Sequence, residues 1–229
     1  MKKPIVIGID GIHRSGKGTQ KKMVNDYLIG QGKRVFTLRW EYYRTGNGDN
    51  KSYFNPYSSW WIENASNISN YKEKSERLER EIHYWLNKYL PSQLELDGYK
   101  EDWYVILDRT IFSRQISNLI YNQHGLIDSS SYFSKVAPDI IFILDVDQKE
   151  TLRRLDNTDL KTEFLLDDEI NYKRKFINSF FDQNICIKEF IEKNFTAQSD
   201  LFVWIDAANS PEQVSKDILT NLHNRWLTL

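Results

Sequence analysis

The chain has 229 residues and carries 31 Lys and Arg against 32 Asp and Glu, so its net charge is -1. The length suits one substantial core. The charge balance argues against a broad nucleic-acid or membrane surface, although it allows a local basic pocket. Cys186 is the only cysteine, which excludes an intrachain disulfide and makes a reducing compartment the simplest setting. We therefore expect a soluble, cytoplasmic protein that binds neither nucleic acid nor membrane.

The first predicted element is a strand over residues 5–9, whose apolar run is typical of burial on both faces. The next stretch has the spacing G-x-x-x-x-G-K of a phosphate-binding loop, in which backbone N–H groups and a helix N-terminus point at one anion. A chance glycine-rich turn is the weaker reading, because strand, loop and helix follow in the required order. The predicted phosphate-binding residues are Gly11, Ile12, His13, Arg14, Ser15, Gly16, Lys17, Gly18 and Thr19.

An amphipathic helix over residues 18–29 and a strand over residues 35–38 follow. Strand, helix and strand in this order form a parallel crossover, and ligands gather at the carboxyl ends of such strands. The second strand delivers Arg39 and Glu41 to that edge.

From residue 42 to 71 the periodicity fails, and aromatic side chains alternate with polar ones. Such aromatics either stack on a base or anchor a loop to the core, and we favour the anchor. A helix over residues 73–96 and a strand over residues 103–107 come next. That strand ends in Asp108 and Arg109, which form either a structural ion pair or, as we favour beside a phosphate loop, part of the functional site.

The remaining pattern predicts a helix over 112–121, a strand over 139–146 and a helix starting at 149–155. Residues 156–168 are polar and without period, which suits a mobile flap. One long helix is predicted over 169–194, then a strand over 201–205 and a closing helix over 211–226. No repeat or interdomain linker is visible, so we expect a single domain over residues 1–229.

Four stretches together resemble the thymidylate kinases, which are nucleoside monophosphate kinases of the phosphate-loop class. The stretches follow the family's order and span most of the chain, leaving out chiefly residues 42–77. They are GIHRSGKGTQ at 11–20, LDRTIFS at 107–113, PDIIFILDVDQKETLRR at 138–154 and IDAANSPEQV at 205–214.

The resemblance implies that Lys17, with the backbone of Gly16, Gly18 and Thr19, holds the phosphates of ATP. One subgroup of the family carries a helper arginine in the phosphate loop, and the other carries it in the flap. The predicted flap has no arginine between residues 156 and 166, so the chain resembles the first subgroup, with Arg14 in that role. Phosphoryl transfer needs in-line positioning and neutralised charge more than covalent chemistry.

On the acceptor side the resemblance implies that Asp108 lies near Mg²⁺ and the acceptor phosphate, with Thr19 as a second metal candidate. Arg109 would bridge the donor and acceptor phosphates, and Arg39 would hold the acceptor's monophosphate. Glu41, at the end of the same strand as Arg39, is a further substrate candidate.

The chain also departs from the family's pattern. His13 stands where the family has an aspartate that receives the 3′-hydroxyl of the substrate, and it would make that contact as a neutral ring. Gly18 replaces a metal-binding hydroxyl, as in adenylate kinases, which leaves Thr19 to serve. Thr110 replaces a common tyrosine. Ser113 and Arg114 fall on the substrate side, where Arg114 replaces a small residue.

We therefore predict a three-layer α/β fold with a five-stranded parallel sheet, helices on both faces and a flap near 156–168. The predicted activity is transfer of the γ-phosphoryl group of ATP, with Mg²⁺, to a nucleoside monophosphate, dTMP being the first choice. Alternatives are a deoxynucleoside kinase with Glu41 as general base, or a nucleotide-binding module without catalysis. The family usually dimerises, so a homodimer is expected.

Overall fold

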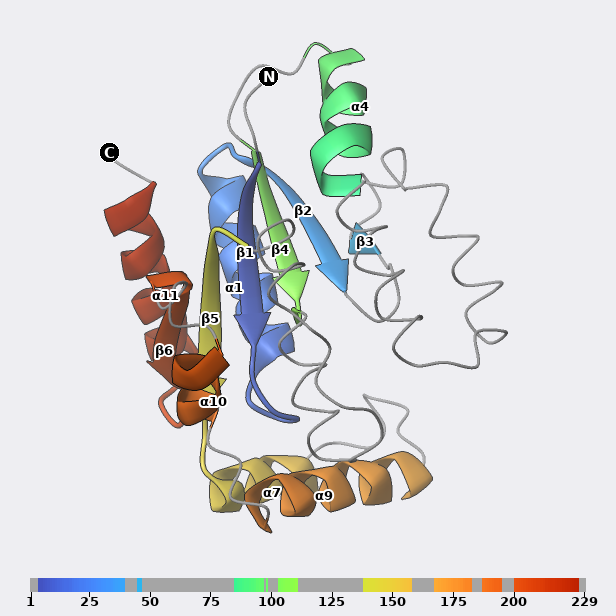
Figure 1. Ribbon diagram of the computed structural model, residues 1–229, viewed down its shortest axis with the longest axis vertical. Coiled ribbons are helices and arrows are strands. Elements are labelled where there is room, and N and C mark those ends of the chain that lie inside the picture. The colour runs from blue at the N-terminus through green and yellow to red at the C-terminus, as the bar shows by residue number, and fades with distance from the viewer. Residues whose placement is uncertain are drawn as a thin grey trace.

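One sheet forms the centre of the described part of the chain (Figure 1). The computed structural model describes residues 4–39, 45–46, 85–96, 98, 103–110, 138–157, 167–182, 187–194 and 200–226. Its parallel strands are β1 (Ile5–Asp10), β2 (Arg34–Arg39), β4 (Trp103–Asp108), β5 (Ile140–Asp145) and β6 (Phe202–Asp206). The sheet order is β3-β2-β4-β1-β5-β6, in which the two-residue strand β3 (Thr45–Gly46) pairs antiparallel with β2.

The predicted α/β fold with five parallel strands is confirmed. The short strand β3 was not predicted, because it lies where the sequence shows no strand periodicity. The strands β1, β4 and β5 are buried along nearly their whole length, as expected of apolar runs covered on both faces.

The register of the strands brings their carboxyl ends together. Strand β1 lies between β4 and β5, and Ile9 is paired with Asp108 of β4. Asp108 is in turn paired with Arg39 at the end of β2. The loop after β1 and the turn after β4 therefore begin side by side at one edge of the sheet.

Helices α1 (Lys17–Gly30) and α11 (Pro211–Arg225) pack against each other beside the sheet (Figure 1). The side chains of Val24, Leu28 and Ile218 are fully buried in the core. The hydroxyl of Tyr27 lies 2.6 Å from Nε2 of His223, which links the two helices by a hydrogen bond.

Local signals set where the helices near the site begin. Helix α11 starts after Ser210, whose Oγ accepts from the backbone N–H of Gln213, and Pro211 takes the first helical position. Helix α7 (Gln148–Asp156) starts after Asp147, whose carboxylate accepts from the N–H of Glu150 at 2.7 Å. Both starts follow directly from parallel strands, so both helices begin near the carboxyl ends of the sheet.

Helix α4 (Leu90–Leu96) follows a π-helical turn over Trp85–Tyr89. This pair is the described part of the helix predicted over 73–96. Pro91 has no N–H to donate to the carbonyl of Asn87, and in a regular α-helix its ring would clash with that carbonyl. The wider π-helical turn leaves space for the ring. Leu86, Leu90 and Leu94 of this segment are buried in the core.

The prediction of one long helix over 169–194 is wrong. The structure has two helices, α9 (Asp167–Asp182) and α10 (Ile187–Asn194), which lie in different places and directions in Figure 1. Apolar spacing continues across both helices, from Phe176 and Phe180 to Ile191, so the sequence pattern could not show the break. All three side chains are buried, so α9 and α10 each bury apolar side chains of their own.

We predict that Gly8 of β1 cannot be replaced without loss of stability. A Cβ at this position would lie 2.6 Å from Cγ2 of Thr110 and 3.2 Å from Cγ1 of Ile141. Overpacking of this kind costs about 1–3 kcal/mol, so Gly8→Ala should lower the free energy of unfolding by that amount in urea titrations. Gly30→Ala is the control, because nothing lies within 4 Å of its Cβ, and it should be neutral or stabilising. Equal effects of the two substitutions would contradict the packing argument.

Candidate active site

The loop between β1 and α1 makes a tight turn at the end of the sheet. Gly11 has φ +139°, and a Cβ there would lie 2.7 Å from both the Leu144 carbonyl oxygen and Ser15 Oγ, so only glycine fits. Gly16 has φ +100° and immediately precedes the first residue of α1, Lys17. The turn therefore presents the positive end of α1 at the carboxyl edge of the sheet, as an anion-binding loop requires.

Lys17 is held inside this loop. Lys17 is only 7% exposed, and its Nζ donates to the carbonyl oxygens of Gly11 at 2.9 Å and Ile12 at 2.5 Å. The ammonium group is thus fixed over the loop, where the sequence predicts the outer phosphates of a nucleotide.

Asp10 connects the loop to the turn after β4, a role that the sequence analysis missed. The Asp10 carboxylate is fully buried and accepts from Gly11 N–H at 2.8 Å. Its other oxygen accepts from the backbone N–H of Thr110 at 3.0 Å and from the Thr110 hydroxyl at 2.6 Å. Residues 100 positions apart are therefore held together, and no local pattern signals such a contact.

Arg14 and Arg109 share an unusual backbone conformation. Among the described residues they are the two non-glycine residues with positive φ, at 63° for Arg14 and 74° for Arg109. This conformation costs roughly 1–3 kcal/mol and clusters at functional sites, where surrounding contacts impose it. Arg109 is held by its N–H, which donates to the Ile9 carbonyl oxygen at 3.0 Å. Both arginines were predicted to be catalytic, and both line the same cavity.

Asp108 forms an ion pair with Lys21, which the sequence analysis did not single out. Lys21 Nζ lies 2.8 Å from Asp108 Oδ2, and the side chains are 27% and 10% exposed. A signal was available, because Lys21 is four residues after Lys17 and residues at this spacing share one helix face.

His13 is half-buried and lies against Phe176 of α9 in an edge-to-face contact with 4.6 Å between ring centroids. Arg109 Nη2 lies 3.5 Å from His13 Nδ1, and a guanidinium is only a donor, so Nδ1 is an unprotonated acceptor. Burial, and next the charge of Arg109, lower the pKa of His13 from its ordinary 6.5 to about 2, with further contributions from Lys17, Lys173 and Arg14. His13 is therefore a neutral ring near pH 7.

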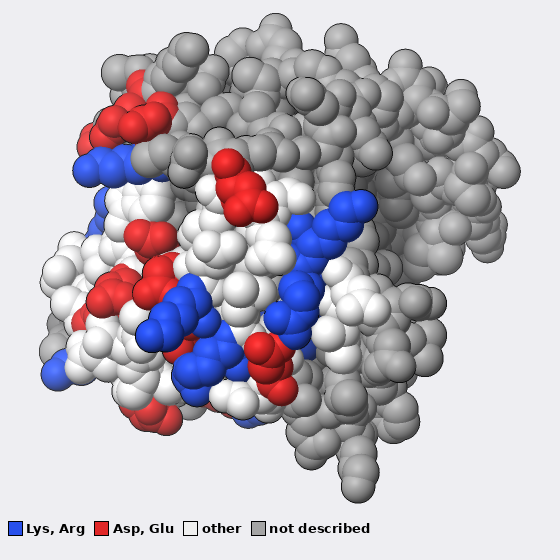
Figure 2. All heavy atoms as spheres, turned by 90° about the horizontal axis from the view of Figure 1, so that it is seen from below, with Lys and Arg blue, Asp and Glu red and all other residues white. Residues whose placement is uncertain are grey.

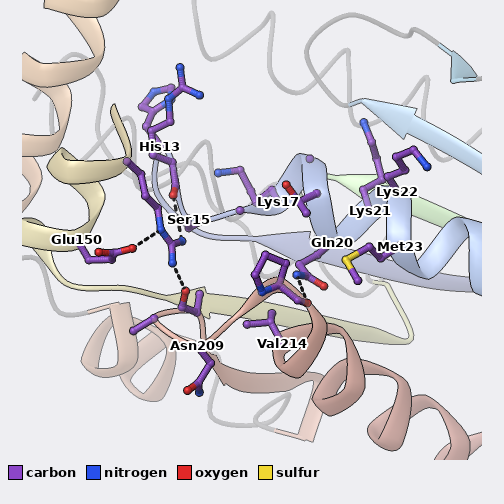
Figure 3. Close-up of a pocket in the computed structure, with 18 of the residues that line it drawn as sticks. His13, Ser15, Lys17, Gln20, Lys21, Lys22, Met23, Glu150, Asn209 and Val214 are labelled. Carbon is purple, nitrogen blue, oxygen red and sulfur yellow. Dashed lines mark hydrogen bonds and ion pairs between the residues drawn. The ribbon is translucent and has the colours of Figure 1, made fainter. Parts of the chain in front are cut away.

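Arg154 of α7 forms another wall of the site. Its Nε donates to Glu150 at 2.7 Å, and its Nη2 donates to the Ala207 carbonyl oxygen at 2.6 Å. Its Nη1 lies 3.4 Å from the carbonyl oxygen of Arg14 in the loop. Arg154 thus connects the loop, α7 and the segment between β6 and α11. Figure 3 shows labelled residues of these three parts around the cavity: Ser15 of the loop, Glu150 of α7 and Asn209 before α11.

These residues enclose a cavity of about 1020 Å³. The cationic lining greatly exceeds the anionic lining, although the whole chain has net charge -1. Figure 2 views the molecule from below Figure 1, which is the side toward which the strands point. On this face, Lys and Arg side chains cluster beside a few Asp and Glu side chains. Of the described residues, the cations of the lining are Arg14, Lys17, Lys21, Lys22, Arg109, Arg153, Arg154 and Lys173, and the acids are Asp108 and Glu150.

The structure brings the predicted donor residues together. The residues from His13 to Thr19 line the cavity with Asp108 and Arg109. Arg39 is described at backbone level, at the register position beside Asp108. The candidates Glu41, Ser113 and Arg114 lie outside the described residues, as do most of the predicted flap at 158–166 and most of the segment 42–77.

The residues present fit a magnesium ion that arrives with phosphates. Mg²⁺ keeps several waters and takes one or two carboxylates together with substrate phosphate oxygens. The Asp108 carboxylate and the exposed Thr19 line the same cavity. Within the described part of the chain, no three His, Cys, Asp or Glu side chains form a metal-binding group. The Asp108 carboxylate and the Thr19 hydroxyl therefore suit a metal ion whose other ligands are nucleotide phosphates and water.

The fold and this loop define a phosphate-loop nucleotide-binding protein of the α/β class. A family model described as "Thymidylate kinase" matches residues 64–218, which is more than half of the chain. The chain therefore belongs to the thymidylate kinase family and is an ATP-dependent nucleotide kinase. No curated protein sequence matches it.

The limits of the family match are informative. The match starts at residue 64, so it includes part of the segment 42–77, in which the sequence analysis found no likeness to the family. The phosphate loop at residues 11–19 lies before the match. Its assignment accordingly rests on its own geometry, which agrees with the family that the later residues identify.

The helices that the structure describes are all too short or too polar to cross a membrane.

We predict that His13 makes the protein less stable in acid. The folded state keeps His13 neutral down to a pKa of about 2, whereas the unfolded chain takes up a proton below about pH 6.5. The unfolded state binds more protons below pH 6.5, so stability falls as the pH falls through that value. Between pH 7.5 and pH 5 this amounts to as much as about 2 kcal/mol.

Urea titrations of the wild type and of His13→Gln at both pH values isolate this contribution, because the other three histidines are common to both proteins. The loss of stability on acidification should be smaller by about 1–2 kcal/mol in His13→Gln. An identical loss in both proteins would mean that His13 titrates normally in the folded state.

Proposed function

We propose that this kinase transfers the γ-phosphoryl group of ATP to a nucleoside monophosphate, with dTMP as the first candidate, and releases ADP. The observation that carries the proposal is the charge of the cavity. Among the residues that the structure describes, eight Lys and Arg side chains and two carboxylates line it, which leaves an excess of six positive charges. A nucleoside triphosphate and a dianionic monophosphate together carry about six negative charges, since a phosphate monoester approaches two charges at pH 7.

The donor half of the proposal rests on the loop. The N-terminus of α1 and the Lys17 ammonium lie at one point, and phosphate oxygens can replace the carbonyls of Gly11 and Ile12 as partners of Lys17. The cavity extends from there to the segment around Ala207 and Asn209, past Arg154. We assign the phosphates of ATP to the loop and its nucleoside to this extension.

The acceptor half rests on the turn after β4. Arg109 lies in the strained backbone conformation at the cavity wall, within reach of His13. Arg39 ends the neighbouring strand at the register position of Asp108, which suits a partner for the acceptor's monophosphate. A neutral His13 accepts a hydrogen bond from a sugar hydroxyl less strongly than a carboxylate would, since charge-assisted bonds are about twice as strong.

The proposed reaction uses magnesium, which would arrive with ATP and neutralise charge on its phosphates. Asp108 and Thr19 are the protein groups that we assign to holding it. We assign the cations of the cavity to orienting both phosphates for in-line transfer, and Arg14 to stabilising the charge that develops.

The proposal includes a cytoplasmic location and a homodimer. The single cysteine suits a reducing compartment, and the family resemblance supports the dimer. Size-exclusion chromatography with light scattering measures the oligomeric state directly.

A coupled assay of ADP release over the common nucleosides and nucleoside monophosphates tests the activity. Turnover with dTMP and none with thymidine is the expected result, and the reverse would select the deoxynucleoside kinase instead. Lys17→Ala should abolish turnover while the protein stays folded, because the cation over the loop is lost. No turnover with any acceptor would overturn the proposal.

We predict that Arg14→Ala lowers kcat by about 10³-fold or more, the range of an arginine that stabilises transition-state charge. The affinity for ATP should change far less, because the interaction strengthens as charge develops. Single-turnover kinetics and equilibrium binding separate the two effects. Arg225→Ala, at the end of α11 and outside the cavity, should leave both unchanged. A loss confined to ATP binding would make Arg14 a ground-state contact only.

A further inference from the structure

Lys21 brings an extra ammonium group to the carboxylate of the site. It lies one turn after Lys17 on α1, and its Nζ is 2.8 Å from Asp108 Oδ2. The pair joins α1 to the end of β4, across 87 positions of sequence. No role in the proposed reaction described above uses this lysine.

The two partners differ in their freedom to move. Asp108 ends a central strand that is paired on both sides, to Ile9 and to Arg39, and its side chain is only 10% exposed. Lys21 reaches it on a four-carbon stem from a helix surface, with 27% of its side chain exposed. An incoming group can therefore displace the lysine without moving the carboxylate.

Both carboxylates of the described cavity lining are paired with cations. Glu150 accepts from Arg153 and from Arg154, and Asp108 accepts from Lys21. A bare divalent cation entering the cavity thus meets an excess of positive charge and a carboxylate that is already neutralised. A metal ion bound to a nucleoside triphosphate brings a net negative charge instead, and its phosphate oxygens are acceptors for the displaced ammonium.

We propose that Lys21 is a positioning residue that reserves Asp108 for metal bound to nucleotide. Its ammonium occupies Asp108 Oδ2 until the donor arrives, then moves to phosphate oxygens and leaves the carboxylate to the hydrated metal. Divalent metal therefore enters the site with ATP and not ahead of it. This inference rests on the proposed function for the identity of the donor, whereas its test does not require turnover.

Mn²⁺ is the probe, measured by electron paramagnetic resonance on the full-length protein without nucleotide. The wild type should bind Mn²⁺ weakly. Lys21→Met removes the competing charge and should tighten binding by about tenfold or more. Lys21→Arg keeps the charge and should bind as weakly as the wild type. Lys216→Met, an exposed lysine of α11 outside the cavity, is the matched control and should change nothing.

Asp108→Asn locates the effect at the carboxylate. In the Lys21→Met background it should abolish the gain in Mn²⁺ affinity. In the wild-type background it should leave Mn²⁺ binding unchanged, because Lys21 already occupies Asp108, and this arm holds even if Lys21→Met does not fold.

Two results would overturn the inference: wild-type Mn²⁺ affinity in folded Lys21→Met, or weaker Mn²⁺ binding in Asp108→Asn alone. Absence of turnover with every acceptor would instead remove the proposed function and leave the metal result standing. Kinetics add a further check, because Lys21→Met should become inhibited by free Mg²⁺ at concentrations that the wild type tolerates.

Discussion

The site depends on the buried carboxylate of Asp10. It holds the first N–H of the phosphate loop, from Gly11, and the N–H and hydroxyl of Thr110 after β4. A buried carboxylate is stable only when its oxygens are hydrogen-bonded, so these contacts come as a set. The set holds the loop that carries Lys17 at a fixed distance from the turn that carries Arg109. In the proposed reaction this would align the donor and acceptor groups before any ligand binds, which lowers the entropy cost of bringing two phosphates together.

The positive charge gathered beside the Asp10 hydrogen bonds must be balanced within the fold. Like charges repel, so each cation must find an acceptor while the fold forms. Lys17 donates to carbonyl oxygens of the loop, and Lys21 donates to Asp108. Arg154 donates to the Ala207 carbonyl oxygen and to Glu150. These acceptors are neutral carbonyls or carboxylates already engaged, and phosphate oxygens are stronger partners for the same cations. The cations are therefore paired within the fold, and in the proposed function phosphate oxygens would replace these partners.

The loop at residues 11–19 and the family match over 64–218 are independent lines of evidence, because they do not overlap. The loop has the backbone geometry of an anion-binding turn, which many nucleotide-binding proteins share. The match shows the family through the later strands and helices. The family match makes the chain a nucleotide kinase of one family, and the loop geometry agrees with that assignment.

The sequence by itself predicted the five parallel strands and the phosphate-binding loop in their order, but not the short strand β3. Apolar runs predicted the five parallel strands, and the glycine and lysine spacing predicted the loop, because burial on both faces and phosphate binding each impose a short-range pattern. The same kind of pattern failed for α9 and α10, where apolar spacing continues although the two are separate helices. Short-range periodicity reports which residues are buried, not which partner buries them.

Only the tertiary structure decided the contacts between distant residues. Asp10 and Thr110 are 100 positions apart, His13 meets Phe176 of α9, and Lys21 reaches Asp108 across the sheet edge. The neutral state of His13 depends on burial and on cations from other elements, so no local sequence feature encodes it. Electrostatics and hydrogen bonding act through space, and the distances that govern them exist only once the strands have been placed side by side.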